Sequence, residues 1–486
     1  MKIRRRSFLK TVGMFGVGAL TYHPAIGAFA QDPIGGQQDP SAGQWFPTTC
    51  QGCTTWCPVE VFIQGGRAVK VRGNQNSKTN PGTVCPKGHL MPKQIYDPDR
   101  IKVPMKRTNP EKGKGIDPQF IPITWDEALG TIADKMMELR AANETHKFVY
   151  LRGRYSYHRD IIYKALPQIF GSPNGISHSS VCAEAEKAGA YWTEGYWDYR
   201  DYDLANTKYL VLWGVDPFRS NRLIPAAIAQ WATIRENATV VTIDPTLTAA
   251  AAKSDEWLAI KPGEDGALAS AIAHHILVNG LWHKEFVGDF NGTGAAAFVA
   301  NTDVNESDFT EVESSGLVKW WNIELKDKTP EWAAGITGIA QAKIEEIAEG
   351  MAAQAPSVAV WYGPGVCMNP KGTYTAMAIY ALNGLLGSIG NVGGVLRKNS
   401  SPSSKGIPSS YSDYKDDIAK AGTGNPKIDQ RGTLAMPAMN KASGKGVVTN
   451  NVPNAMLAAD PYDVKMVIGN WCNFIYSGTQ PQRWRD

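Results

Sequence analysis

Short apolar runs alternate with amphipathic stretches along the chain from residue 148 onward. The apolar runs predict strands, and the stretches with helical periodicity predict helices. Continuous apolar strands that alternate with helices are typical of parallel sheets covered on both faces. The pattern therefore predicts an α/β fold with two mostly parallel, doubly wound domains. The expected strands are 148–152, 208–213, 239–243, 257–261, 357–361 and 463–468, and the expected helices are 158–168, 182–191, 221–235, 266–279, 341–353 and 373–386.

The region before residue 148 has a different pattern. Two short apolar runs, 59–63 and 68–72, flank Gly65-Gly66 and predict a hairpin. Trp125 opens a predicted amphipathic helix that ends near Arg140, with acidic residues in its first turn as the helix dipole favours. Gly, Pro, Lys and polar residues elsewhere predict an exposed lead-in, a linker and long surface loops. These are 31–47, 102–121 and 398–450, respectively.

Composition narrows the class of protein. The 486 residues are 43% hydrophobic and 20% charged, with a net charge of +4 and no basic tract, which argues against nucleic-acid binding. Forty-eight Gly and 15 Trp fit a loop-rich enzyme. A chain of this length can form two to four domains.

The first thirty residues have the pattern of a twin-arginine signal peptide. Arg4-Arg5-Arg6-Ser7-Phe8-Leu9-Lys10 precedes an apolar stretch, and Ala28-Phe29-Ala30 forms a small-x-small cleavage site. Residues 11–22 are too short and too weakly apolar to span a bilayer. We therefore expect export in the folded state to the periplasm or the outer face of the cytoplasmic membrane.

Four of the seven cysteines form one group: Cys50, Cys53, Cys57 and Cys85, with spacing C-x2-C-x3-C-x27-C. Four thiolates brought to one place are what a [4Fe–4S] cluster requires. A four-cysteine zinc site usually has two C-x2-C pairs, and the second pair is missing here. A disulfide framework is the other alternative in an exported protein. The close run of three cysteines favours the cluster, and so a protein that moves electrons.

The end of the sequence comes soon after an expected strand. Val464-Lys-Met-Val-Ile468 enters a Gly-Asn-Trp turn, and the sequence stops at Asp486 without a capping element or polar tail. We interpret the chain as a fragment truncated inside its architecture.

In this order, the motifs resemble the molybdopterin oxidoreductase family of the dimethyl sulfoxide reductase type. The likeness covers nearly all of the chain, although each motif alone is weak. The motifs are the twin-arginine start, the cysteine group with Cys85-Pro-Lys87-Gly88, Ile-Thr-Trp-Asp-Glu-Ala-Leu129, Trp213-Gly214-Val215-Asp216-Pro217, Ile243-Asp244-Pro245, Lys261-Pro-Gly-Glu-Asp265 and Asn383-Gly-Leu-Leu-Gly387-Ser-Ile-Gly390-Asn-Val-Gly-Gly394.

The resemblance implies a cofactor and a domain plan. The expected cofactors are the cluster and molybdenum bis(molybdopterin guanine dinucleotide). The expected plan is a signal peptide (1–30), a [4Fe–4S] domain (31–107), a discontinuous α/β molybdopterin domain (108–200 with 356–486) and an α/β dinucleotide-binding domain (201–355). Members of the family continue into a C-terminal barrel-like domain, to which nothing in this sequence corresponds.

Several residues are expected to contact the cofactor. Gly214 and Asp216 follow an expected strand, where glycine allows close approach of the backbone to a pyrophosphate. Asp244 and Asp265 are placed to accept hydrogen bonds from guanine or ribose, although capping of helices is the alternative. The resemblance further implies pterin contacts for Gly363 and electron passage near Lys87, for which tight turns and a solvated surface lysine are the alternatives.

The resemblance places the protein ligand of molybdenum at Cys182, and a thiolate suits a metal already bound to sulfur. Gly153-Arg154-Tyr155-Ser156 and the stretch from His178 to Lys187 resemble the respiratory arsenate reductase branch of the family. The implied oxyanion pocket contains Arg154, Tyr155, His178 and Lys187; the alternative is ordinary structural pairing of Arg154 and His178. Cys367 and Cys472 are isolated, and we expect buried free thiols.

The implied activity is transfer of an oxygen atom from arsenate to molybdenum, with electrons arriving through the cluster. A ferredoxin-like iron–sulfur subunit is the expected electron-transfer partner, often with a quinol-oxidising membrane protein. Alternatives are a reductase of selenate, tetrathionate, thiosulfate or polysulfide, or an arsenite oxidase. A further alternative is an electron-transfer protein without molybdenum, against which Cys182 and the dinucleotide motifs argue.

Overall fold

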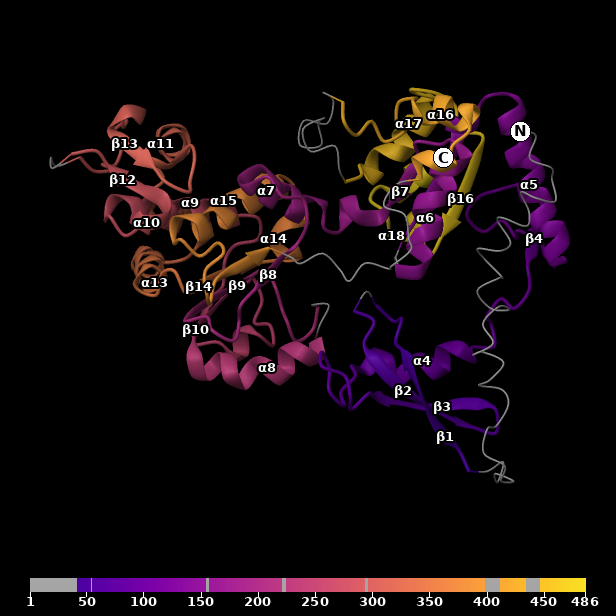
Figure 1. The fold of residues 1–486 in the computed structure, drawn as a ribbon, viewed down its shortest axis with the longest axis horizontal. Helices are drawn as coiled ribbons and strands as arrows, with labels where there is room; N and C mark the ends of the chain where they lie inside the picture. The colour runs from indigo at the N-terminus through magenta and orange to yellow at the C-terminus, as the bar shows by residue number, and fades with distance from the viewer. Residues whose placement is uncertain are drawn as a thin grey trace. The chain divides into compact units, whose positions relative to one another are not determined.

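The computed structural model describes residues 42–53, 55–153, 157–220, 224–292, 296–397, 411–433 and 446–486. The chain forms two compact units. The first comprises Met1–Ser177, Gly406–Asp429 and Asn451–Asp486, and the second comprises His178–Lys405 and Gln430–Asn450. Figure 1 labels their helices and strands.

The second unit is built on a four-stranded parallel sheet with the order β11-β10-β9-β14. In the central pairs, Trp213 of β9 lies opposite both Ile243 of β10 and Tyr362 of β14. The carboxyl ends of these three strands therefore lie at one edge, where open α/β sheets bind ligands. The strands are β9 (Tyr209–Trp213), β10 (Thr239–Ile243), β11 (Glu256–Leu258) and β14 (Val358–Tyr362).

Both faces of this sheet are buried, which explains why its strands are continuously apolar. Tyr209, Val211 and Trp213 of β9 pack into the core that contains α9, α13 and α15, whereas Leu210 and Leu212 pack against the core that contains Ile234 of α8. The sheet is therefore covered on both sides (Figure 1). The helices of this unit include α7 (Glu184–Glu194), α8 (Ile224–Asn237), α9 (Asp265–Val278), α13 (Gln341–Ala353), α14 (Pro364–Cys367) and α15 (Gly372–Leu385).

An aromatic cluster organises the segment that follows α9. Its rings include Trp282, Phe290, Phe298, Phe309 and Trp321, with neighbouring centroids 5.0–6.3 Å apart. The sequence pattern did not predict the short elements that carry them. These are α10 (Lys284–Val287), β12 (Gly288–Phe290), β13 (Phe309–Glu311), α11 (Leu317–Trp320), a π-helical turn (Trp321–Leu325) and α12 (Pro330–Thr337); a separate pair joins β8 (Arg200–Tyr202) to β15 (Val395–Arg397).

The first unit contains a three-stranded parallel sheet with the order β16-β6-β7. Phe148 and Tyr150 pack against α5 and α6, whereas Val149 and Leu151 pack with Val452 and other residues on the opposite face. The elements are β6 (Phe148–Arg152), β7 (Gly175–Ser177), β16 (Met466–Asn470), α5 (Trp125–Ala141), α6 (Tyr157–Phe170), α16 (Asp417–Thr423), α17 (Val452–Ala458), α18 (Phe474–Ser477) and α19 (Pro481–Arg485).

The four clustered cysteines lie on a small antiparallel subdomain of the first unit. Its sheet has the order β1-β2-β3, and α4 contacts β3. A separate hairpin, β4–β5, follows it. The elements are β1 (Gln44–Thr49), β2 (Pro58–Gln64), β3 (Arg67–Gly73), α4 (Pro86–Ile95), β4 (Met105–Arg107) and β5 (Phe120–Pro122).

The structure confirms the predicted α/β class, with an element at each predicted strand and helix position from residue 148 onward. It corrects three predictions made from composition. The lead-in contains most of β1 and the linker contains β4 and most of β5, because strands pair through backbone N–H and C=O groups and do not require alternating apolar residues. The loops predicted over 398–450 include α16 and the fully buried Ile428, which belongs to the core beneath β6. The expected domain boundaries stay a prediction.

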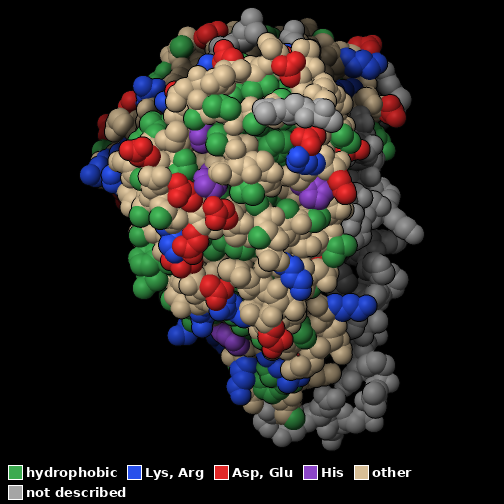
Figure 2. Space-filling view, turned by 90° about the vertical axis from the view of Figure 1, so that its left-hand side faces the viewer, with side chains coloured by type: hydrophobic (Ala, Val, Ile, Leu, Met, Phe, Trp, Pro, Cys, Tyr) green, Lys and Arg blue, Asp and Glu red, His purple; other side chains and the backbone are tan. Residues whose placement is uncertain are grey.

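Two surface properties complete the description. Within the described ranges, no helix combines the length and apolarity needed to cross a membrane. On the face drawn in Figure 2, acidic and basic side chains are interspersed, and hydrophobic side chains occur in small groups.

Candidate redox and cofactor site

The cysteine group is built by the ends of three elements. Cys50 follows β1 and Cys57 precedes β2, and the loop between them is closed by the Cys50 N–H, which donates to the Cys57 carbonyl at 2.9 Å. Cys53 Sγ accepts from the Thr55 N–H at 3.4 Å. Cys85 is the N-cap residue of α4. Three thiols therefore come from one loop, as the spacing predicted, and the fourth comes from the start of a helix that the sequence pattern did not predict.

Electrostatics show that the four thiols are neighbours. Burial, together with repulsion from the nearby Cys53, Cys50 and Cys85, raises the pKa of Cys57 to about 11. The pKa of Cys50 is also raised, chiefly by burial, with additional repulsion from Cys53 and Cys85. Thiolates that repel one another in this way are stabilised when they share positively charged iron.

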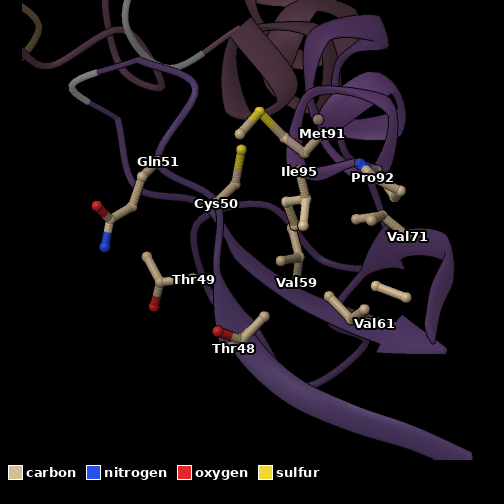
Figure 3. Close-up of a pocket in the computed structure, with 12 residues that line it drawn as sticks. Thr48, Thr49, Cys50, Gln51, Val59, Val61, Val71, Met91, Pro92 and Ile95 are labelled. Atoms are coloured by element: carbon tan, nitrogen blue, oxygen red, sulfur yellow. The ribbon is translucent and has the colours of Figure 1, made fainter. Parts of the chain in front are cut away.

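Two glycines keep space open beside the Cys50 sulfur. A Cβ on Gly52 would lie 3.6 Å from Cys50 Sγ and 3.4 Å from Met91 Sδ, and a Cβ on Gly88 would lie 3.7 Å from Cys50 Sγ. Figure 3 shows the Cys50 thiol and the Met91 side chain pointing toward one another. The space beside the Cys50 sulfur fits an inorganic group bound through that sulfur.

The arrangement differs from that of a single-ion site. In the part of the chain that the structure describes, no group of three or more His, Cys, Asp or Glu side chains is placed to hold one metal ion. In a cubane each of the four thiolates binds a different iron, so the four sulfurs lie farther apart than the ligands of a single ion. Lys87, in the first turn of α4, is exposed, and its expected role near a pterin stays a prediction.

A second candidate region lies at the carboxyl ends of β9 and β14. Gly214 has φ +59°, and its carbonyl accepts from the Gly365 N–H at 3.0 Å. The Gly363 N–H donates to the Trp213 carbonyl at 3.0 Å. A Cβ on Gly214 would lie 2.9 Å from Val366 N, so close approach of this neighbouring turn requires the glycine. Its contact with a dinucleotide stays a prediction.

Asp216 has an unsatisfied oxygen in the same region. Its Oδ1 accepts from the Phe218 N–H at 2.9 Å, whereas Oδ2 is buried and has no hydrogen-bond partner among the described residues. A buried carboxylate oxygen without a donor is costly, and it fits a ligand that supplies one. The residues at this edge therefore fit a bound nucleotide.

The other two aspartates differ in environment. Asp265 begins α9, and its Oδ1 accepts from Trp213 Nε1 at 2.9 Å; burial raises the pKa of this carboxyl. Asp244 follows β10, and its Oδ1 accepts from the Thr246 N–H and hydroxyl. Neither side chain is seen to cap a helix. Asp265 lies beside the carboxyl end of β9, while Asp244 closes a local turn.

The predicted molybdenum ligand lies in a short segment that leads into α7. His178 opens a 3-10 turn, His178–Val181, and the Cys182 N–H donates to the Ser179 carbonyl at 3.0 Å. Both side chains are half-buried. Lys187 lies in the second turn of α7, in the same unit as Cys182 and His178. Arg154 and Tyr155 lie outside the described residues.

Two residues beside Lys187 were missed by sequence reasoning. Glu184 Oε1 lies 3.8 Å from Lys187 Nζ, and burial raises the pKa of this carboxyl. The Lys187 ammonium also lies over the Tyr199 ring, 4.9 Å from its centroid. The i, i+3 spacing of Glu184 and Lys187 on a helix could have revealed the first contact. No pattern in the sequence signals the second.

The isolated cysteines have different surroundings. Cys367 is 3% exposed in the main core of the second unit, as predicted, and burial raises its pKa well above the usual value. Cys472 is only half-buried, and its thiol lies 3.8 Å from the Leu151 carbonyl.

Comparison with known proteins decides the family. The molybdopterin oxidoreductase family matches residues 100–467, and the Fe4S4 domain of molybdopterin oxidoreductases matches residues 43–97. The chain belongs to the molybdopterin oxidoreductase family. The two family matches imply a molybdopterin cofactor and an Fe4S4 cluster.

Individual relatives refine this assignment. The chain is 53% identical over its whole length to the arsenate respiratory reductase molybdopterin-containing subunit of Chrysiogenes arsenatis, and 46% identical to that of Shewanella sp. (strain ANA-3). It spans 57% of the length of each. Among solved structures, acetylene hydratase from Pelobacter acetylenicus has the same fold, with a TM-score of 0.59 and 20% identity over 72% of this chain and 44% of that one.

Proposed function

We propose that this chain belongs to the catalytic subunit of a respiratory arsenate reductase, which reduces arsenate to arsenite. The observation that carries the proposal is the 53% and 46% identity, over the whole chain, to two arsenate respiratory reductase subunits. The grouping of Cys182, His178 and Lys187 in one unit supports it.

The proposed cofactor is molybdenum bis(molybdopterin guanine dinucleotide). When bound, it supplies two-electron oxygen-atom exchange with the substrate. Cys182 would provide the thiolate ligand to the metal, and the carboxyl edge of the four-stranded sheet would hold nucleotide. The contributing residues are Gly214, Asp216, Asp244, Asp265 and Gly363. Asp216 Oδ2 is buried and has no hydrogen-bond partner among the described residues, so the cofactor would supply its donor.

Substrate binding would rest on positive charge. Lys187 supplies a point charge and Arg154 a fork of N–H donors, which together match an oxyanion. Glu184 and Tyr199 hold the Lys187 ammonium in place. His178 and Tyr155 would deliver protons, because loss of one oxygen from arsenate as water consumes two protons and two electrons.

Electrons would enter through the four-cysteine cluster. Cys50, Cys53, Cys57 and Cys85 are the proposed ligands, and Lys87 lies two residues after the last of them. An iron–sulfur electron-transfer subunit would deliver the electrons, itself supplied by a quinol-oxidising membrane protein. We further propose export by the twin-arginine pathway to the periplasm, on the basis of Arg4-Arg5-Arg6 and the Ala28-Phe29-Ala30 cleavage site.

The test replaces each proposed anchor of the oxyanion separately. Arg154→Ala and Lys187→Met should each lower kcat/KM for arsenate roughly 10- to 100-fold, because each removes a charge-assisted hydrogen bond. Molybdenum content should stay unchanged. Oxidation of a reduced viologen by arsenate, measured alongside selenate, thiosulfate, tetrathionate and polysulfide, gives the activity and the preference among oxyanions.

The matched control is Lys319→Met, because Lys319 is a lysine of the same unit with a 65% exposed side chain. It should leave kcat/KM unchanged. Parental kinetics in Arg154→Ala and Lys187→Met would contradict the proposed pocket. Faster turnover of another oxyanion by the parent protein would instead redirect the substrate assignment.

A further inference from the structure

An apolar pocket lies on the Cys50 side of the cysteine group. Its volume is about 310 Å³. The α4 side contributes Gly88, Met91, Pro92 and Ile95, and the sheet contributes Val59 and Val71. These four α4 residues share one face of the helix, because their spacing is i, i+3, i+4 and i+7. Thr48, Thr49 and Gln51 also line the pocket, and apart from Cys50 it has no titratable side chain.

Met91 lies where this pocket meets the cysteine loop. A Cβ on Gly52 would lie near both sulfurs, 3.4 Å from Met91 Sδ and 3.6 Å from Cys50 Sγ. In Figure 3 the Met91 side chain points toward the Cys50 thiol, whereas Gln51 points away from it. Cys50 and Met91 therefore line the pocket together, and Met91 is an apolar side chain close to the Cys50 sulfur.

We propose that Met91 is a positioning residue that lowers the reduction potential of the iron–sulfur cluster by keeping water and polar groups away from the Cys50 sulfur. This inference rests on the proposed ligation by Cys50. Reduction adds one electron and no proton, so it adds a negative charge to a cluster already bound to four thiolates. An apolar surrounding disfavours the added charge, whereas N–H donors and solvent stabilise it.

The experiment measures the cluster rather than turnover. The complete subunit is purified with its cluster, and the EPR signal of the reduced cluster is followed during potentiometric titration. Met91→Gln places an amide donor beside the sulfur, and Met91→Ala admits water. Each should increase the ratio of reduced to oxidised cluster at least tenfold at a fixed potential, which is an upward shift of about 59 mV for one electron.

Two further variants distinguish the effect of a polar group beside the Cys50 sulfur from a general effect on folding. Met91→Leu keeps the wall apolar, so its ratio should stay within about twofold of the parent. Leu90→Gln makes the same apolar-to-amide change on α4 at a side chain that is 56% exposed and does not line the pocket. It should not shift the potential. Iron content is measured for every variant.

The outcomes are distinguishable. Unchanged potentials in Met91→Gln and Met91→Ala, or an equal shift in Leu90→Gln, overturn the inference while leaving the proposed ligation intact. Loss of iron in both Met91 variants, with Leu90→Gln intact, overturns it in favour of a purely structural role. A parent protein without a reducible iron–sulfur signal overturns the cluster ligation itself.

Discussion

Gly214 shows at the level of one residue how the carboxyl edge of the four-stranded sheet is made. Its backbone is left-handed, with φ +59°, and the next turn packs against it through Gly365 and Val366. The neighbouring Gly363 would place a Cβ 2.9 Å from Val215 Cβ. Small residues therefore let the ends of β9 and β14 approach each other near the buried Asp216 carboxylate.

We predict that Gly214→Ala destabilises the protein by roughly 2–4 kcal/mol. About 1–2 kcal/mol comes from the left-handed conformation, and the remainder comes from crowding of the Val366 backbone. Urea denaturation followed by tryptophan fluorescence would measure the change. Gly195→Ala is the matched control, because Gly195 has φ +81° with nothing within 4 Å of an added Cβ, and should cost only about 1–2 kcal/mol. Equal losses in the two variants would contradict the role of close packing at Gly214.

At the level of elements, a buried ionic network fastens α7 to its neighbours. Arg200 of β8 donates from Nε to Glu194 of α7 and to the Tyr380 hydroxyl of α15, each at 3.1 Å. The same guanidinium donates to the carbonyls of Asp198 and Tyr196. The Arg200 and Glu194 side chains are 2% and 8% exposed. Helix α7 also carries Lys187, and its first residue, Glu184, follows shortly after Cys182. The network therefore holds the C-terminal end of the helix that carries Lys187.

We predict that Glu194→Gln lowers the free energy of unfolding by roughly 3 kcal/mol or more, because it leaves a buried guanidinium without its counter-charge. Tyr380→Phe should cost about 2 kcal/mol, because the hydroxyl both accepts from Arg200 and donates to Glu194. Chemical denaturation measures both. Glu306→Gln breaks an exposed pair with Lys319 and should change stability by less than about 1 kcal/mol. A Glu194→Gln variant as stable as Glu306→Gln would show that the network makes no net contribution to the free energy of unfolding.

At the level of the whole molecule, the two sheets and the cysteine subdomain have cores of very different size. The second unit has a large core that includes all three long strands, whereas the hydrophobic cluster of the cysteine subdomain has only three buried residues, Cys57, Val59 and Val71. So small a core supplies little stability. The subdomain should therefore depend on its cluster, because binding of a metal group by four thiolates adds folding free energy.

We predict that removing iron by oxidation and chelation unfolds the cysteine subdomain locally. Backbone amides of β2 and β3 should lose hydrogen-exchange protection, while those of β9, β10 and β14 should retain it. Mass-spectrometric hydrogen exchange on the iron-loaded and iron-free protein makes this comparison, with β9 as the internal control. Equal protection of β2 and β3 in both samples would show that the subdomain folds without its cluster.

Local sequence pattern predicted much of this architecture. Strands such as 148–152 and 239–243 were predicted with their observed bounds, because a strand buried on both faces must be apolar throughout. The cysteine spacing likewise predicted a loop of three thiols and a fourth from beyond the hairpin. In contrast, β4 and β5 carry no apolar alternation, and Ile428 lies in a polar stretch, so pattern alone assigned them to linkers and loops.

What the sequence by itself determined is therefore the local chemistry: the α/β class, the cysteine group, and the family to which the motifs belong. Only the tertiary structure decided which distant residues meet. It pairs β6 with β16, which lie more than 300 residues apart, and it brings Asp265 to Trp213 and Tyr199 to Lys187. The physical reason is that periodicity records which side of an element is buried, whereas contacts between elements depend on packing across the whole chain.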